Sequence, residues 1–184
     1  SGAFSFSTPN AGPNGISGGF KFSTGTSSAG DSGTFSLSTG DATKGKSGSM
    51  LLKIGTGNVG DGGRFELDVG DTTGADGNGG SITVVAGHSN DPSGNNGGSI
   101  SITAGHTRGS ETSDDGGSIT VNAGLAATGN GGNIDVTTGY SESTSSGAFS
   151  FSTPNAGPNG ISGGFKFSTG TSSAGDSGTF SLST

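Results

Sequence analysis

A motif of about 15 residues recurs along the whole chain, and this repeat limits the chain to a small set of folds. Each repeat, called a line below, opens with Ser-Gly or Gly-Gly and follows the pattern G-x-Φ-x-Φ-x-(T/A)-G, where Φ is apolar. A segment this short cannot bury its apolar face alone, so such repeats build extended, stacked architectures. The lines follow one another without interruption and comprise residues 1–16, 17–31, 32–46, 47–61, 62–78, 79–96, 97–115, 116–130, 131–145, 146–161, 162–176 and 177–184.

The positions within a line, called columns below, differ consistently in the residues that they carry. Column two is glycine in all twelve lines, and all 11 phenylalanines occupy column four or column six. Alternate residues of a strand face the same side, so columns four, six and eight are predicted to point inward together. The predicted core ladder consists of Phe4, Phe6, Phe20, Phe22, Phe35, Leu37, Phe65, Leu67, Ile82, Val84, Ile100, Ile102, Ile119, Val121, Ile134 and Val136.

Stacking each line in register on the next would bury this face between like side chains. We therefore expect an all-β fold, namely a parallel β-solenoid (β-helix) with thin rungs of roughly 15 residues, uncapped at both ends. Glycines in columns two and nine are predicted at its corners, where positive φ or close backbone approach is needed. At roughly 4.8 Å per rung, nine rungs would advance by some 43 Å.

A second, longer repeat is superimposed on the lines. Residues 1–39 recur without a single change as residues 146–184, at an offset of 145 residues. We interpret residues 1–145 as one nine-line solenoid unit and residues 146–184 as the start of the next identical unit of a continuous solenoid. The parent protein is expected to be longer.

Charge and composition bear on the class of function. The net charge is −7, and Lys and Arg do not cluster, which argues against nucleic acid as a partner. No apolar run is long enough to cross a bilayer. In the outward columns charges are sparse and opposite signs are neighbours, as with Lys53 and Asp68 one line apart. No Ser-His-Asp or Cys-His pattern has supporting context, so we expect no enzyme and no cofactor.

Lines five to seven carry longer loops, and these hold the most varied chemistry. The loops Asp71–Asn78, His88–Asn96 and His106–Asp115 are predicted to stack into one ridge, a candidate for lateral contact. Its candidate contact residues are His88, His106, Arg108, Glu111, Asp114 and Asp115. Because His88 and His106 share a column in successive lines and Asp71 lies one line earlier, the three are also candidate metal ligands. The alternative is that both histidines are simply exposed at the base of long loops.

The segments Gly97–Gly105 (GGSISITAG) and Phe6–Gly12 (FSTPNAG) resemble the giant Ser/Gly/Thr-rich tandem-repeat surface and fibre proteins of microalgae and related protists. The resemblance covers the whole chain and implies a fibrous product at the cell surface or outside the cell, without enzymatic activity. We expect the shaft of an extracellular filament, with copies of the chain as end-to-end and lateral partners and O-linked glycan or polysaccharide as a further partner. The alternative is a repetitive adhesin stalk or a module that binds polysaccharide, mineral or ice.

Overall fold

The structure is a computed structural model that describes residues 2–109 and 114–183. No residue of these two ranges belongs to a helix or a strand, and the backbone is extended or irregular between its turns. The chain divides into two units, Ser1–Val84 and Val85–Thr184, and each is described by itself. Since no sheet is formed within the described residues, the β-solenoid stays a prediction.

Among the described residues, ten of the twelve lines contain one turn or bend, always in the loop that follows column eight. They lie at residues 13–14, 28–30, 43–45, 58–61, 74–76, 92–93, 127–129, 142–144, 158–160 and 173–175. These loops are rich in Gly, Ser, Asn and Asp, which favour turns because they tolerate unusual φ angles or bond to nearby backbone groups. Each of these ten lines is therefore an extended segment, from about column three to column eight, followed by a loop that reverses the chain.

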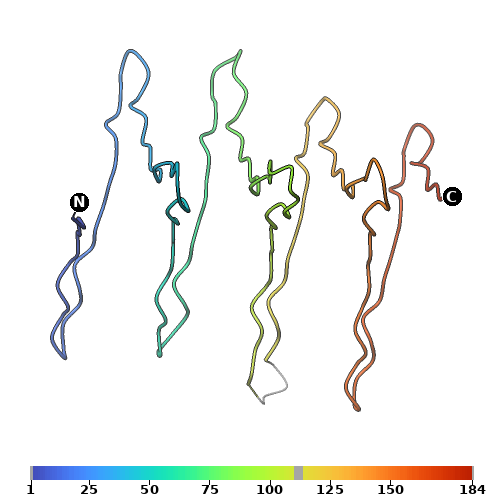
Figure 1. Ribbon diagram of the computed structural model, residues 1–184. Coiled ribbons are helices and arrows are strands. Elements are labelled where there is room, and N and C mark those ends of the chain that lie inside the picture. The colour runs from blue at the N-terminus through green and yellow to red at the C-terminus, as the bar shows by residue number, and fades with distance from the viewer. Residues whose placement is uncertain (1, 110–113, 184) are drawn as a thin grey trace. The chain divides into compact units, whose positions relative to one another are not determined.

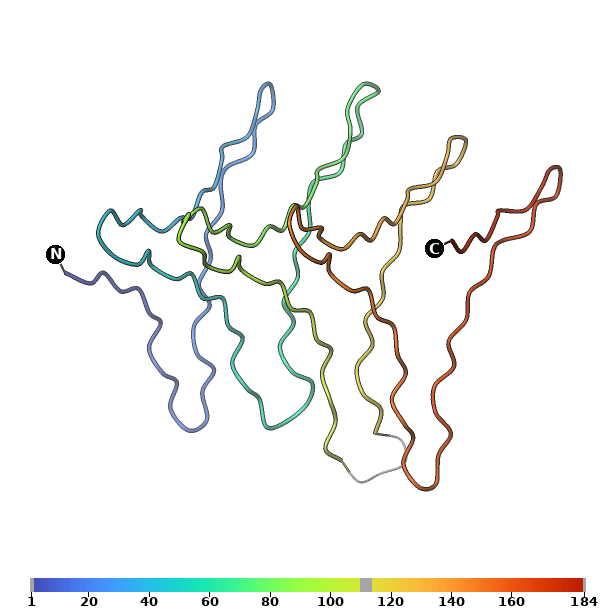
Figure 2. The same cartoon turned by 45° about the vertical axis from the view of Figure 1, so that its right-hand side comes forward.

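The reversal places consecutive lines side by side. Column eight of one line lies against column two of the next, for example Thr24 against Gly33. Where both columns carry phenylalanine, the column-six ring of one line meets the column-four ring of the next, as Phe6 meets Phe20. Figure 2 shows the out-and-back path of the chain in each unit. A line and its successor thus face each other through the columns that were predicted to point inward.

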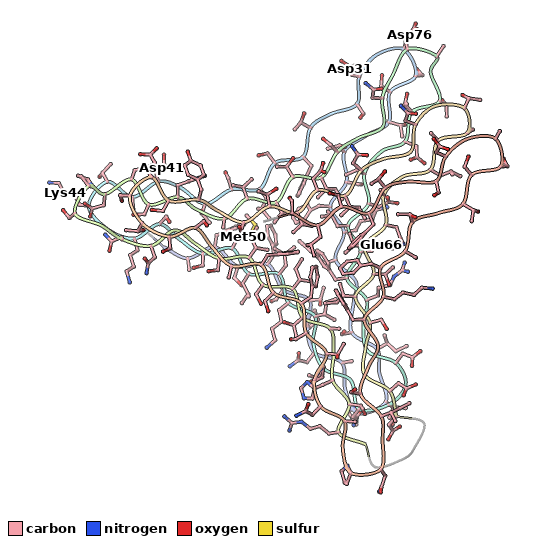
Figure 3. All side chains as sticks on the ribbon, turned by 90° about the vertical axis from the view of Figure 1, so that its right-hand side faces the viewer. Asp31, Asp41, Lys44, Met50, Glu66 and Asp76 are labelled. Carbon is pink, nitrogen blue, oxygen red and sulfur yellow. The ribbon has the colours of Figure 1, made fainter. Side chains whose placement is uncertain are left out.

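Loops of consecutive lines project to different sides within unit Ser1–Val84. Figure 3 places Asp31 and Asp76, from lines two and five, on one side and Asp41 and Lys44, from line three, on another. The chain of this unit therefore returns to the same side after three lines. In Figure 1 the loops of lines two and five appear in light blue and green, and they lie well apart.

Candidate functional site

The closest recurring contact of the chain is the junction between column eight of one line and column two of the next. At all eleven junctions, a Cβ built on the column-two glycine would lie within 4 Å of the column-eight side chain. At Gly63 it would come to 2.7 Å from Ile54 Cγ2, and at Gly98 to 3.2 Å from the backbone nitrogen of Gly87. Close approach therefore explains the glycine at five junctions, namely Gly63, Gly80, Gly98, Gly117 and Gly132, whereas the added Cβ would make an ordinary contact of 3.5–3.8 Å at the other six.

Backbone hydrogen bonds close five of these junctions, in lines six to ten. The column-two N–H donates to the column-nine carbonyl of the preceding line in the pairs Gly80–Gly70, Gly98–Gly87, Gly117–Gly105, Gly132–Gly124 and Gly147–Gly139, at 2.8–3.0 Å. Positive φ, the other reason offered for corner glycines, occurs among the described residues only at Gly60 and Gly94, which belong to neither column. Column-nine glycines meet nothing within 4 Å on their open side.

Phenylalanines of columns four and six form a chain of ring contacts along the first three lines. Phe4 and Phe6 meet edge to face with ring centroids 4.7 Å apart, and Phe6 meets Phe20 of the next line at 6.1 Å. The identical segment in the other unit repeats this geometry, at 4.5 Å for Phe149 with Phe151 and 5.7 Å for the next pair. Columns four and six thus share one side of the chain, and rings link consecutive lines.

These apolar columns are nevertheless open to solvent in the single chain. No hydrophobic side chain among the described residues is buried, and Phe4 is 84% exposed and Ile102 76%. Only five described residues are half-buried, and three of them belong to column eight: Ala86, Ala104 and Thr138. The burial of the predicted core ladder therefore does not come from contacts within the described chain, and it stays a prediction.

Few charged groups interact in the outward columns. The ion pair that the described residues form joins Arg64 to Glu66, two residues apart in line five. The predicted pairing of Lys53 with Asp68 on adjacent lines is not among these contacts and stays a prediction.

The loop His88–Asn96 is organised around Asp91. Its carboxylate accepts hydrogen bonds from the Ser93 backbone N–H at 2.9 Å and from Asn95 Nδ2 at 3.1 Å. The Gly94 N–H donates to the Asp91 carbonyl at 3.1 Å, and Gly94 adopts φ +85°. The hydrogen bonds from Ser93, followed by the one from Asn95, hold the pKa of Asp91 below its usual value. The Asp-Pro-Ser-Gly sequence of residues 91–94 is a turn signal that is already visible in the sequence.

The loop that begins at His106 also makes contacts of its own. Arg108 Nε donates to His106 Nε2 at 3.2 Å, so this ring nitrogen is an acceptor in the described geometry. A Cβ on Gly109 would collide with the carboxylate of Asp114, which therefore lies over the backbone of the same loop. Glu111, one of the predicted lateral-contact residues, lies outside the described residues. For His88 and Asp115 the structure gives no contact that bears on lateral binding.

The candidate metal ligands are divided between the two units. Asp71 belongs to Ser1–Val84, whereas His88 and His106 belong to Val85–Thr184. Within the part of the chain that the structure describes, no three His, Cys, Asp or Glu side chains are grouped as a metal ion would require. The metal site stays untested as a prediction, and no geometry supports it.

The predicted ridge needs the loops of consecutive lines on one edge. Lines two and three project theirs to different sides, so a single chain does not assemble consecutive loops in that way in unit Ser1–Val84. The candidate site that does emerge is the exposed apolar face of columns four and six, together with the glycine junctions between lines.

Comparisons with protein families, with curated proteins and with solved structures found no match. Among the described residues there is also no helix long and apolar enough to cross a membrane.

Proposed function

We propose that this chain is a structural protein that forms the shaft of an extracellular filament by β-solenoid stacking of its tandem lines. The observation that carries the proposal is the exposure of a regular apolar ladder, in which columns four and six remain open from the first line to the last. Monomeric soluble proteins rarely expose continuous apolar surface on this scale, and larger patches mark interaction sites.

The extended segments have the sequence features of β-strands, although none is paired in a sheet among the described residues. They alternate apolar and polar residues, and they contain β-branched and aromatic side chains in the apolar columns. Stacking such segments at strand spacing would cover the apolar columns and pair the backbone at once. The product is a long, uniform fibre in which length and stiffness are the function.

The alternative function, an adhesin stalk or a surface-binding module, has less support. Binding of polysaccharide or mineral calls for a recurring exposed patch of aromatic or charged residues, yet Tyr140 is the one aromatic residue of the chain outside columns four and six. It is 82% exposed, and it occurs once per 145-residue unit.

Electron microscopy and fibre diffraction of the concentrated, purified chain test the filament. We expect unbranched fibres of uniform width with a meridional reflection near 4.8 Å, the spacing of stacked strands. Specific binding to a polysaccharide or mineral by a chain that stays monomeric would favour the alternative. A soluble chain without fibres and without such binding would contradict both functions.

A further inference from the structure

The area that the chain leaves uncovered is far larger than a folded monomer can sustain. Its accessible surface is 18,395 Å², whereas a folded monomer of 17.4 kDa exposes about 7,900 Å². A stable protein interface buries about 1,600 Å² in total, so the surplus equals several such interfaces. Small adjustments within one chain cannot remove a surplus of this size.

The backbone groups of the extended segments also lack hydrogen-bond partners among the described residues. Among the described residues, the hydrogen bonds between backbone groups lie at the glycine junctions or inside the loops, and none involves columns three to seven. Backbone N–H and C=O groups are obligatory hydrogen-bonding groups, and a row of them along an extended segment is a template for pairing with another strand. Each line therefore offers one row of donors and acceptors on each of its two edges.

The same chain does not occupy these edges. Its consecutive lines contact each other through their side chains and at the glycine junctions, because column six meets column four and column eight meets column two. In unit Ser1–Val84 the chain returns to the same side only three lines later, as Asp31 and Asp76 show (Figure 3). The positions next to a line along the stack are thus left for other chains.

The pattern of the chain identifies these other chains as copies of itself. A segment that stacks on a line must present apolar side chains in two matching columns and a glycine at a matching junction, every 15 residues or so. This chain has that pattern twelve times. Its identical segments also adopt similar ring geometry, with interplanar angles of 36° for Phe6 with Phe20 and for Phe151 with Phe165. Every copy of the chain therefore presents the same apolar surface each time this segment recurs.

Charge decides the register between copies. If each line stacked on its own counterpart, every charged residue would face an identical charge, which destabilises a ladder. If line n stacks on line n+1, Lys53 falls beside Asp68, and no like charges become neighbours anywhere in columns five and seven. The second register is the one that the charge pattern allows.

We propose that further copies of this chain lie between its successive turns, so that line n of one copy stacks on line n+1 of another. Because the chain returns to the same side after three lines, three intertwined copies complete the stack. This inference rests on the proposed filament and specifies how it is built. It also brings loops of lines five, six and seven, from three copies, onto one edge.

Disulfide trapping tests the arrangement, since the chain has no cysteine of its own. Ser101 and Thr120 both occupy column five, in lines seven and eight. In the proposed register, Ser101 of one copy lies one strand spacing from Thr120 of another, about 4.8 Å, within the Cα separation that a disulfide bridges. The single variants Ser101→Cys and Thr120→Cys are assembled alone and as a 1:1 mixture, then oxidised and resolved on non-reducing gels.

We expect covalent dimers in the mixture and at least tenfold fewer in either variant alone. The matched control mixes Ser101→Cys with Asn122→Cys, which moves the partner thiol two residues along the segment, beyond disulfide reach, and should give few dimers. The double variant Ser101→Cys/Thr120→Cys should give linked chains. A double variant that is oxidised within single chains, with a mixture that stays monomeric, would overturn the inference.

The outcomes separate this inference from the proposed function. Dimers in each single variant alone would support stacking between copies but overturn the register of line n on line n+1. Fibres with the 4.8 Å reflection but without any cross-link would overturn the intertwined copies and leave the filament standing. If no fibres form, the filament itself is wrong, and microscopy shows this before any oxidation.

Discussion

Replacement of Gly63 by alanine probes the junction between lines at its tightest point. The new Cβ would lie 2.7 Å from Ile54 Cγ2, whereas ordinary van der Waals contact begins at 3.4 Å. Ile54 cannot swing this methyl group away cheaply, because it is attached to Cβ and a β-branched side chain is stiff at χ1. The segment must shift instead, and overpacking of this kind costs about 1–3 kcal/mol.

The matched control is Gly33→Ala, at the same column of line three. Its new Cβ would lie 3.7 Å from Thr24 Cβ, an ordinary contact, and neither glycine has positive φ. Alanine in a compatible backbone restricts the unfolded chain and stabilises by about 0.4–1 kcal/mol. The two substitutions should therefore change stability in opposite directions, as measured by the denaturant midpoint of fibre dissociation followed by circular dichroism.

A double-mutant cycle tests the cause. Ile54→Ala removes the obstructing methyl group, and lines six and seven already carry alanine at this column. In the Ile54→Ala background, Gly63→Ala should cost at least 1 kcal/mol less than in the parent, a rough coupling energy for residues in contact. Equal costs in both backgrounds, or equal effects of Gly63→Ala and Gly33→Ala, would refute the close-approach explanation of Gly63.

Three further predictions concern the apolar columns and the loops. Ile100→Asp should destabilise the assembled fibre by several kcal/mol, because an unpaired charge enters the stack, while Ser101→Asp in the adjacent outward column should be milder; equal losses in thermal melts would contradict the assignment of the columns. Shortening the loops Asp71–Asn78 and His88–Asn96 to the common line length should preserve fibres but weaken their bundling in electron micrographs; unchanged bundling would show that the loops are passive. The pKa of the Asp91 carboxylate, measured by carbon-detected NMR, should lie below its usual value of 3.8, because the hydrogen bonds from Ser93 and Asn95 favour the charged form. These bonds should therefore order the loop above pH 3.8, and this order should be lost as the pH falls through the lower pKa of the folded chain. A titration midpoint of Asp91 at or above pH 3.8 would contradict the turn.

Local features could be predicted because they depend on residues close in sequence. The turn with the Gly15 N–H bonded to the Gly12 carbonyl at 3.0 Å recurs between Gly160 and Gly157 at 3.1 Å, since the same residues stand there. The one-sided placement of Phe4 and Phe6 likewise follows from the period of an extended backbone. The turn at Asp91 and the Arg108–His106 contact were missed, although Asp-Pro-Ser-Gly is a recognisable signal.

The sequence by itself determined the columns: which residues alternate, where glycine recurs, and how long each loop is. These follow from composition at each position and need no knowledge of what lies across the loop. Only the tertiary structure decided which columns meet, because that depends on how a loop of several residues closes and brings Ile54 against Gly63. It also decided that the loops of lines two and three diverge in unit Ser1–Val84. A period in the sequence states that like segments stack, but it cannot state whether the next segment comes from the same chain, because both arrangements pair the same columns.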